Sequence, residues 1–362
     1  MLKTIAGSKR PNVLRLENVS KKYGTRTVLD GVSLTIPADE YVSLLGPSGS
    51  GKTVLLRVIA GFEQPDGGRV FVDDIRIDGI PAHRRGIGFV FQNFALFPHL
   101  NVTDNIAYGL TYGTHKGSAM QSSVRAMIAL VGLEGLEDRG VHQISGGQRQ
   151  RVALARTLVT EPRLVLLDEP LGALDAHLRA RMQGELRAIR EQLGVTFLHV
   201  TGNETEALAM GDRTIVLDEG RVAQVDTPDR IYNAPASPDV ARFLNSYNLF
   251  EGTLSGTRFT ASCGTFDVVK PAAPWARPTY AIRQDLVAIR PAAEAPAAGE
   301  AGTVARFVAD EYSGPTILYL FELPDRNMVE VEDHLSHRAP RTLVPGEDYA
   351  LVWKSDDAVV FG

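Results

Sequence analysis

The sequence lacks the features that mark secreted, membrane-spanning or nucleic-acid-binding chains. Its 362 residues contain one cysteine, Cys263, which excludes a disulfide framework and favours a reducing compartment. No run of about 18 apolar residues occurs, and the first residues lack the apolar core of a signal peptide, so we expect no transmembrane helix. The formal net charge is -5, which gives no sign of a nucleic-acid partner.

The chain is long enough for two domains, and a hydrophobic fraction of 44% supplies their cores. Strand-like runs alternate with helical patterns between residues 13 and 238, which favours a largely parallel sheet flanked by helices. Residues 102–138 have no strand pattern, so we place a helical subdomain at about 93–160. The clearest strand or helix patterns lie at residues 40–45, 52–60, 164–167, 175–194 and 195–200.

The pattern changes near residue 238. Helical periodicity fades, and short alternating runs separated by turn-forming residues take its place. These runs lie at residues 258–262, 280–282, 317–321, 328–331 and 349–353. They predict a second, all-β domain over residues 239–362, and the sequence leaves open whether it forms one barrel or two.

A glycine-rich segment, Gly46-Pro-Ser-Gly-Ser-Gly-Lys-Thr53, lies between a predicted strand and a predicted helix, as a phosphate-binding loop requires. Its glycines allow successive backbone N–H groups to surround phosphate oxygens. Lys52 carries a positive charge for the β- and γ-phosphates, and Thr53 offers a hydroxyl to Mg²⁺. We therefore expect nucleotide binding at Gly46, Pro47, Ser48, Gly49, Ser50, Gly51, Lys52 and Thr53.

Two carboxylates, Asp168 and Glu169, end the apolar run at residues 164–167. Ligands of open α/β sheets bind at the carboxyl ends of strands. We expect Asp168 to hold Mg²⁺, through water, and Glu169 to polarise the attacking water as general base. A solvated acidic turn is the alternative, and the phosphate loop in the same chain disfavours it.

The segment Ile144-Ser-Gly-Gly-Gln-Arg-Gln-Arg151 opens a predicted helix 20 residues or so before the acidic pair. It resembles the signature motif of ABC ATPases, with Ile144 where leucine is usual. The resemblance implies that ATP is held between two chains, because this motif faces the γ-phosphate bound by the other subunit. The residues it assigns to this contact are Ser145, Gly146, Gly147 and Gln148.

Three further positions match the ABC family, and the resemblance covers residues 13–240 almost continuously. Gln92 matches the glutamine loop, which implies a role in catalysis with Glu169 and Lys52, and in sensing Mg²⁺ and the attacking water. Asp175 matches a carboxylate that crosses the dimer interface. Tyr23 matches the aromatic residue that stacks on adenine, although a lone tyrosine is more often a core or surface residue.

The chain also resembles the importer ATPases that carry a C-terminal, oligonucleotide-barrel-like domain of the TOBE type. Residues 231–235, 240–244, 248–252 and 281–286 carry this resemblance. It implies an α/β P-loop cassette followed by an OB-like β barrel, with ATP and Mg²⁺ as cofactors. It also implies a homodimer or paired ATPase, integral membrane permease subunits and, indirectly, a solute-binding protein, at the cytoplasmic face of the inner membrane.

The transported solute is not readable from an ATPase, because the ATPase does not touch it. The polyamine (spermidine and putrescine) and ferric-iron branches resemble the chain most, and we expect a polyamine, with ferric iron or another small solute as the alternative. Residues 93–100 form an unusually apolar segment. This segment is either part of a groove for a helix of the membrane subunit or a buried hinge of the helical subdomain, and both alternatives stay open.

The sequence departs from the family pattern at the strand end near residue 200. Gly202 and Asn203 occupy the positions of the usual switch histidine and aspartate. His199 lies three residues earlier, about 10 Å away along an extended strand, so we expect it to be a partly buried strand residue.

The missing histidine leaves four hypotheses open. Glu169 alone gives slow hydrolysis, Asn203 or a water takes part of the role, a second ATPase supplies a complete site, or the chain is a regulatory subunit with little hydrolysis. A soluble ABC ATPase of translation or DNA repair is disfavoured, because those proteins carry two cassettes or a long coiled-coil insertion.

Overall fold

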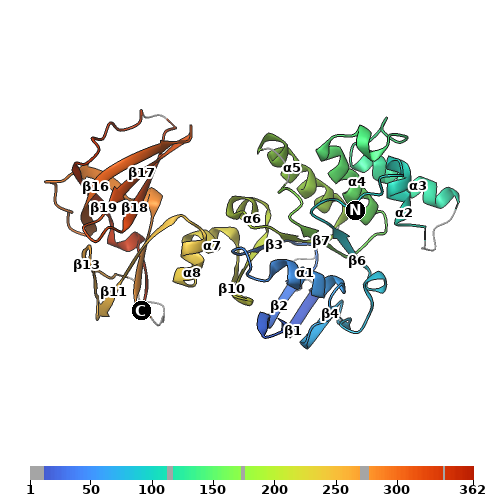
Figure 1. The fold of residues 1–362 in the computed structure, drawn as a ribbon, viewed down its shortest axis with the longest axis horizontal. Helices are drawn as coiled ribbons and strands as arrows, with labels where there is room; N and C mark the ends of the chain where they lie inside the picture. The colour runs from blue at the N-terminus through green and yellow to red at the C-terminus, as the bar shows by residue number, and fades with distance from the viewer. Residues whose placement is uncertain (1–11, 112–116, 173–175, 270–276, 337–338) are drawn as a thin grey trace, which may run out of the picture. The chain divides into compact units, whose positions relative to one another are not determined.

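The computed structural model describes residues 12–111, 117–172, 176–269, 277–336 and 339–362 (Figure 1). The chain divides into two compact units, Met1–Ile231 and Tyr232–Gly362. This division falls a few residues before residue 238, inside a short helix, α7 (Pro228–Asn233). Within the described residues, no helix combines the length and the hydropathy that crossing a lipid bilayer requires.

The first unit is built around a six-stranded sheet with the order β10-β9-β3-β8-β7-β6. Five of its strands, from β9 to β6 in this order, are parallel, and only β10 pairs antiparallel with its neighbour. The largely parallel sheet that the sequence predicts is thus confirmed. The strands are β3 (Tyr41–Leu45), β6 (Ile87–Val90), β7 (Leu164–Asp168), β8 (Thr196–Val200), β9 (Arg213–Asp218) and β10 (Arg221–Asp226).

A second, antiparallel sheet with the order β2-β1-β4-β5 completes the strands of this unit. It comprises β1 (Asn12–Tyr23), β2 (Arg26–Pro37), β4 (Gly67–Val72) and β5 (Ile75–Arg76). The helices are α1 (Lys52–Ala60), α2 (Val102–Tyr108), α3 (Ser118–Leu130), α4 (Gly146–Leu158), α5 (Ala176–Leu193) and α6 (Glu204–Met210). Helices α2, α3 and α4 form the helical subdomain.

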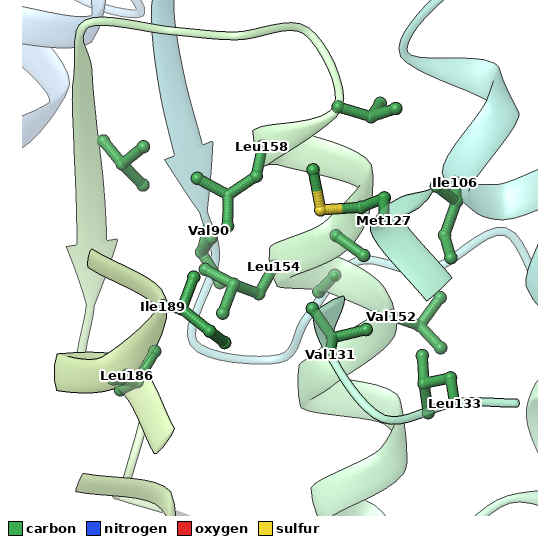
Figure 2. Packing of buried hydrophobic residues seen from close by; sticks show 14 of the residues in the cluster. Val90, Ile106, Met127, Val131, Leu133, Val152, Leu154, Leu158, Leu186 and Ile189 are labelled. Carbon is green, nitrogen blue, oxygen red and sulfur yellow. The ribbon is translucent and has the colours of Figure 1, made fainter. Parts of the chain in front are cut away.

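One apolar cluster joins the helical subdomain to the sheet. Figure 2 shows Leu154 and Leu158 of α4 close to Val90 of β6 and Ile189 of α5, while Met127 of α3 lies beside α4. Apolar residues recur at helical spacing along α5, and Met182, Leu186 and Ile189 among them are buried. Leu193 continues this spacing in the last turn but is 42% exposed, because the helix ends there and Gly194 turns the chain with a φ of 61°.

The second unit is all-β apart from short helical turns, and it consists of two antiparallel sheets of five strands. Their orders are β13-β12-β11-β14-β20 and β15-β19-β16-β17-β18. Aromatic side chains fill the space between them, and the indole Nε1 of Trp353 donates to the hydroxyl of Tyr280 over 2.9 Å. Cys263 packs against this cluster, and burial raises the pKa of its thiol to about 11, which fits a packing role.

Each alternating run of the sequence lies in one strand of these sheets. The first sheet contains β11 (Tyr247–Ser255), β12 (Arg258–Ala261), β13 (Gly264–Asp267), β14 (Thr279–Arg283) and β20 (Val359–Phe361). The second contains β15 (Ala288–Pro291), β16 (Glu300–Tyr312), β17 (Thr316–Glu322), β18 (Met328–His334) and β19 (Asp348–Lys354). Helix α8 (Pro238–Phe243) precedes β11, with Ser237 as its N-cap.

Candidate ATP site

The glycine-rich loop connects β3 to α1, as expected, and two of its glycines are required by close packing. A Cβ atom on Gly46 would lie 2.1 Å from the carbonyl oxygen of Leu217. Gly51 has a φ of 102°, and a Cβ there would lie 2.8 Å from the carbonyl oxygen of Val28. Any side chain at either position would displace the neighbouring backbone, so the path of the loop depends on glycine.

Lys52 begins α1 and folds back over the loop. Its Nζ donates to the carbonyl oxygens of Gly46 (2.7 Å) and Pro47 (2.9 Å). Burial lowers the pKa of Lys52, and the nearby carboxylates of Glu169 and Asp168 oppose that shift. An anion bound in the loop would compensate for the desolvation of the Lys52 ammonium group better than the two carbonyl groups do.

The rest of the loop also fits an anion. Ser48 and Gly49 are exposed, and Thr53 is half-buried in the first turn of α1. The hydroxyl of Ser50 is buried and has no hydrogen-bond partner among the described residues. The N-terminus of α1 adds unpaired N–H groups and a positive dipole end. The eight predicted loop residues thus form one segment between β3 and α1, and the unpartnered Ser50 hydroxyl and the helix N-terminus beside it fit an anion.

The acidic pair lies at the carboxyl end of β7, and its two residues differ in conformation. Glu169 has a φ of 46°, which is rare for a residue with a side chain and costs about 1–3 kcal/mol. Its N–H donates to the carbonyl of Val200 in β8 over 3.0 Å, which holds this turn against the neighbouring strand. The Nε2 of Gln92 donates to Oε2 of Glu169 over 2.9 Å. Two residues 77 positions apart in sequence thus meet.

Asp168 lies in an environment that disfavours a second negative charge. Burial raises its pKa, the carboxylate of Glu169 raises it further, and Arg57 and Lys52 act in the opposite direction. A divalent cation would relieve this repulsion, so the donor set fits Mg²⁺. The described residues contain no cluster of three or more His, Cys, Asp or Glu side chains.

The signature segment forms the start of α4. Ser145 is the N-cap, its hydroxyl accepts from the N–H of Gln148 (3.3 Å), and Oε1 of Gln148 accepts from the N–H of Ser145 (2.8 Å). This reciprocal pair fixes the first turn of the helix. Ser145 is exposed, whereas Ile144 is buried in the subdomain core and Gly147 packs against Leu178. The segment therefore offers an exposed serine and helix N-terminus on a rigid base. Asp175 lies outside the described residues.

Tyr23 ends β1 and is 47% exposed, so it is a surface residue available for stacking. Its hydroxyl donates to a carboxylate oxygen of Glu63, and Nζ of Lys21 lies 5.5 Å from its ring centroid. Glu63 also lies 3.7 Å from Nη1 of Arg57 on α1. Glu63 was not a predicted site residue, and no motif in a single sequence links positions 23 and 63.

At the switch position, Gly202 is exposed, and a Cβ there would have no atom within 4 Å. Its φ lies outside the left-handed region, so its backbone does not require glycine. Asn203 serves as the N-cap of α6, where Oδ1 accepts from the N–H of Glu206 over 2.7 Å. The amide of Asn203 is thus partly committed to capping.

His199 corrects one expectation, because it is fully buried rather than partly buried. Helix α6 covers its side of β8, and Nε2 of His199 lies 2.7 Å from Oε1 of Glu206. This close contact is not aligned as a hydrogen bond. Nδ1 lies 3.3 Å from the hydroxyl of Tyr41. His199 therefore points into the protein and does not replace the missing histidine.

Residues 93–100 show features of both alternatives for this segment, a buried hinge of the helical subdomain and a groove for a helix of the membrane subunit. Phe94 is buried, and Phe94 and Ala95 have positive φ values of 64° and 44°. The guanidinium of Arg156 donates to both of their carbonyl groups, over 2.9 and 2.8 Å. This part of the segment is anchored to α4, as the hinge alternative expects. Next to it, Pro98 and His99 are exposed, so the rest of the segment is open to contact.

The sequence is similar to those of known proteins. Models of the ABC transporter family and of the TOBE domain match residues 29–172 and 285–361. The chain is 42% identical to the spermidine/putrescine import ATP-binding protein PotA of Rubrobacter xylanophilus, over 98% of this chain and 94% of that relative. It is 49% identical to the protein of the same name from Spiroplasma citri, over 67% of this chain and 69% of the relative.

Solved structures agree with the fold of the first unit. A nucleotide-free ATP-binding cassette from an ABC transporter has a TM-score of 0.57 at 26% identity, covering 64% of this chain and 98% of its own. A dimeric cassette in a post-hydrolysis state, bound to ADP and phosphate, has a TM-score of 0.53 at 33% identity, and the match covers 59% of this chain and 98% of that cassette. The chain belongs to the ATP-binding subunits of ABC transporters, with a cassette followed by a C-terminal TOBE domain.

Proposed function

We propose that the chain is the ATP-hydrolysing motor subunit of an import system for a polyamine such as spermidine or putrescine. The chemistry rests on one observation, the 2.9 Å contact of Gln92 Nε2 with Glu169 Oε2, which orients a carboxylate beside the phosphate loop. The solute is inferred from the relative that matches 98% of this chain, which is named for spermidine and putrescine import.

The residues of this chain divide the work of hydrolysis. The loop N–H groups and Lys52 bind the phosphates, and Lys52 exchanges its two carbonyl partners for phosphate oxygens. Glu169 accepts a proton from the attacking water, and Gln92 holds the carboxylate in position. Thr53, Asp168 and Gln92 would hold Mg²⁺, which neutralises phosphate charge when bound.

The site requires a second ATPase chain. Ser145 is exposed and held by its reciprocal hydrogen bonds with Gln148, and it lies on a different element from the phosphate loop. We propose that Ser145, Gly146, Gly147 and Gln148 of one chain contact the γ-phosphate bound by another, in a homodimer or with a paired ATPase. Asp175 would lie at the same interface.

Permease subunits of the membrane are the proposed partners on the cytoplasmic side. An exposed cluster of aromatic residues supports this. Phe62 and Phe91 are both exposed, and their stacked rings have centroids 5.7 Å apart. The ring centroid of Phe89 lies 4.5 Å from that of Phe91, and the three residues form what we call the aromatic patch. Exposed aromatic clusters of this kind are typical of protein–protein contacts. A solute-binding protein would act indirectly, through the permease.

The alternative is a regulatory subunit with little hydrolysis. The observation that favours it is Gly202, where the expected histidine is missing and His199 is buried against Glu206. A related alternative keeps the motor function with ferric iron or another small solute.

Reconstitution tests these alternatives together. The full chain is purified from its native membrane with its permease, placed in proteoliposomes with the solute-binding protein, and supplied with MgATP. Uptake of labelled spermidine or putrescine with phosphate release supports the proposal. Uptake of ferric iron but of neither polyamine would show that ferric iron is the transported solute. Uptake without phosphate release by this chain would favour the regulatory alternative.

A further inference from the structure

The hairpin that carries Tyr23 also carries a cation that reaches the phosphate loop. Strands β1 and β2 are joined by a two-residue turn at Gly24 and Thr25, and Tyr23 pairs across it with Arg26. Nη2 of Arg26 lies 3.9 Å from the position that a Cβ on Gly49 would occupy. The guanidinium group therefore extends from the hairpin to the exposed side of the loop.

Arg26 differs from the other arginines of its sheet. Arg15 and Arg69 contact Glu17, and Arg76 contacts Asp78, so each of the three faces a carboxylate. For the guanidinium of Arg26, the described part of the chain contains neither an ion-pair partner nor a hydrogen-bond acceptor, and the residue is exposed. Its five N–H donors are thus available to a ligand.

The loop that Arg26 approaches carries further positive groups. Lys52 and the N-terminus of α1 lie a few residues after Gly49, the loop residue next to the guanidinium of Arg26. A triphosphate bound at this loop would attract all three groups. A guanidinium also matches phosphate oxygens in pairs, which a single ammonium cannot do.

We propose that Arg26 is a nucleotide-binding residue that contacts the triphosphate from the hairpin side, opposite Lys52. One hairpin then holds both ends of the nucleotide, with the ring of Tyr23 on the base and Arg26 on the phosphates. This rests on the proposed function, because it requires ATP at the loop between residues 46 and 53. It adds a residue that lies outside every motif of the sequence.

Calorimetric titration of the full-length chain with MgATP and with adenosine tests the proposal. We expect Arg26→Gln to weaken MgATP binding about tenfold, as the loss of a charge-assisted contact does, and to reduce its salt dependence. Adenosine affinity should not change, and Arg26→Lys should restore part of the loss. The nucleotide-free melting temperature should stay constant, because the guanidinium has no partner to lose.

Controls separate this proposal from the function on which it rests. Arg69→Gln removes the same charge from the same sheet, away from the loop, and should leave MgATP affinity unchanged. Wild-type MgATP affinity in Arg26→Gln would overturn the proposal, and so would equal losses for MgATP and adenosine, which would show an effect on Tyr23. If the wild-type chain bound no MgATP, the proposed function itself would fail.

Discussion

Glycine residues occur for different reasons at the two edges of the proposed ATP site, the phosphate loop and the switch position at Gly202. At the phosphate loop, a side chain on Gly46 or Gly51 would collide with backbone at 2.1 or 2.8 Å, so glycine is a requirement of the fold. At the switch edge, a Cβ on Gly202 would meet nothing within 4 Å, and its φ suits any residue. One edge is thus fixed by packing, whereas the other has room for the side chain that the family usually places there.

The two glycine positions affect different steps, one nucleotide binding and the other hydrolysis. In the proposed mechanism, nucleotide binding depends on the phosphate loop, where the chain conforms to the family pattern in every residue. Hydrolysis depends in this mechanism on Glu169 and on the groups that assist it, and Gly202 contributes no side chain to them. Gln92 is the only described side chain that donates a hydrogen bond to the carboxylate of Glu169.

The largest effect is expected for Glu169→Gln. Loss of the general base should lower the hydrolysis rate by about 10²–10⁴-fold, while MgATP binding stays near the wild-type level. Phosphate release and nucleotide titration measure the two quantities. Hydrolysis at the wild-type rate in this variant would show that another group is the base.

An increase in the hydrolysis rate is expected for Gly202→His. The position accepts a side chain without strain, so an imidazole there should raise the hydrolysis rate, by up to about 10²-fold if it supplies one transition-state hydrogen bond. Gly202→Ala is the matched control and should leave the rate unchanged. A rate that is unchanged or lower in Gly202→His would show that histidine is not the missing group.

An effect on stability is expected for Gly46→Ala. Its methyl group would overlap the carbonyl of Leu217, so the free energy of unfolding should fall by about 1–3 kcal/mol. Gly202→Ala should change it by less than about 0.5 kcal/mol. Denaturant unfolding without nucleotide measures both. Equal losses in the two variants would contradict the distinction between the two edges.

The smallest effect is expected for Tyr23→Phe. This change removes the hydrogen bond to Glu63 and keeps the ring, so MgATP affinity should fall by about two- to fivefold. Tyr23→Ala removes the ring and should weaken binding more. Equal affinities of the two variants would show that the ring does not stack on the base.

Much of the site could be predicted from sequence because its parts are local. The phosphate loop, the N-cap at Ser145 and the carboxylates that end β7 each depend on a few consecutive residues with fixed conformational needs. The alternating runs of the second unit likewise predicted strands, since a period of two suffices to identify a half-buried strand. The family resemblance followed from the order of these local motifs.

Other features depend on contacts between distant positions, which one sequence does not record. Gln92 and Glu169 meet because β6 and β7 are neighbours in the sheet, and Tyr23 meets Glu63 because the end of β1 lies near the end of α1. The full burial of His199 follows from the packing of α6 over β8. Leu193 has the period of a buried residue and is exposed, because the helix ends there.

The sequence by itself determined the phosphate loop, the acidic pair, the signature helix and the change to an all-β unit, because each is encoded by neighbouring residues. Only the tertiary structure decided which side chains lie near the phosphate loop and the acidic pair. It turned His199 inward, gave Glu169 its partner and brought Arg26 beside the loop. The physical reason is that a side chain's direction and neighbours depend on how strands are ordered and how helices cover them, and this is fixed by packing across the whole unit.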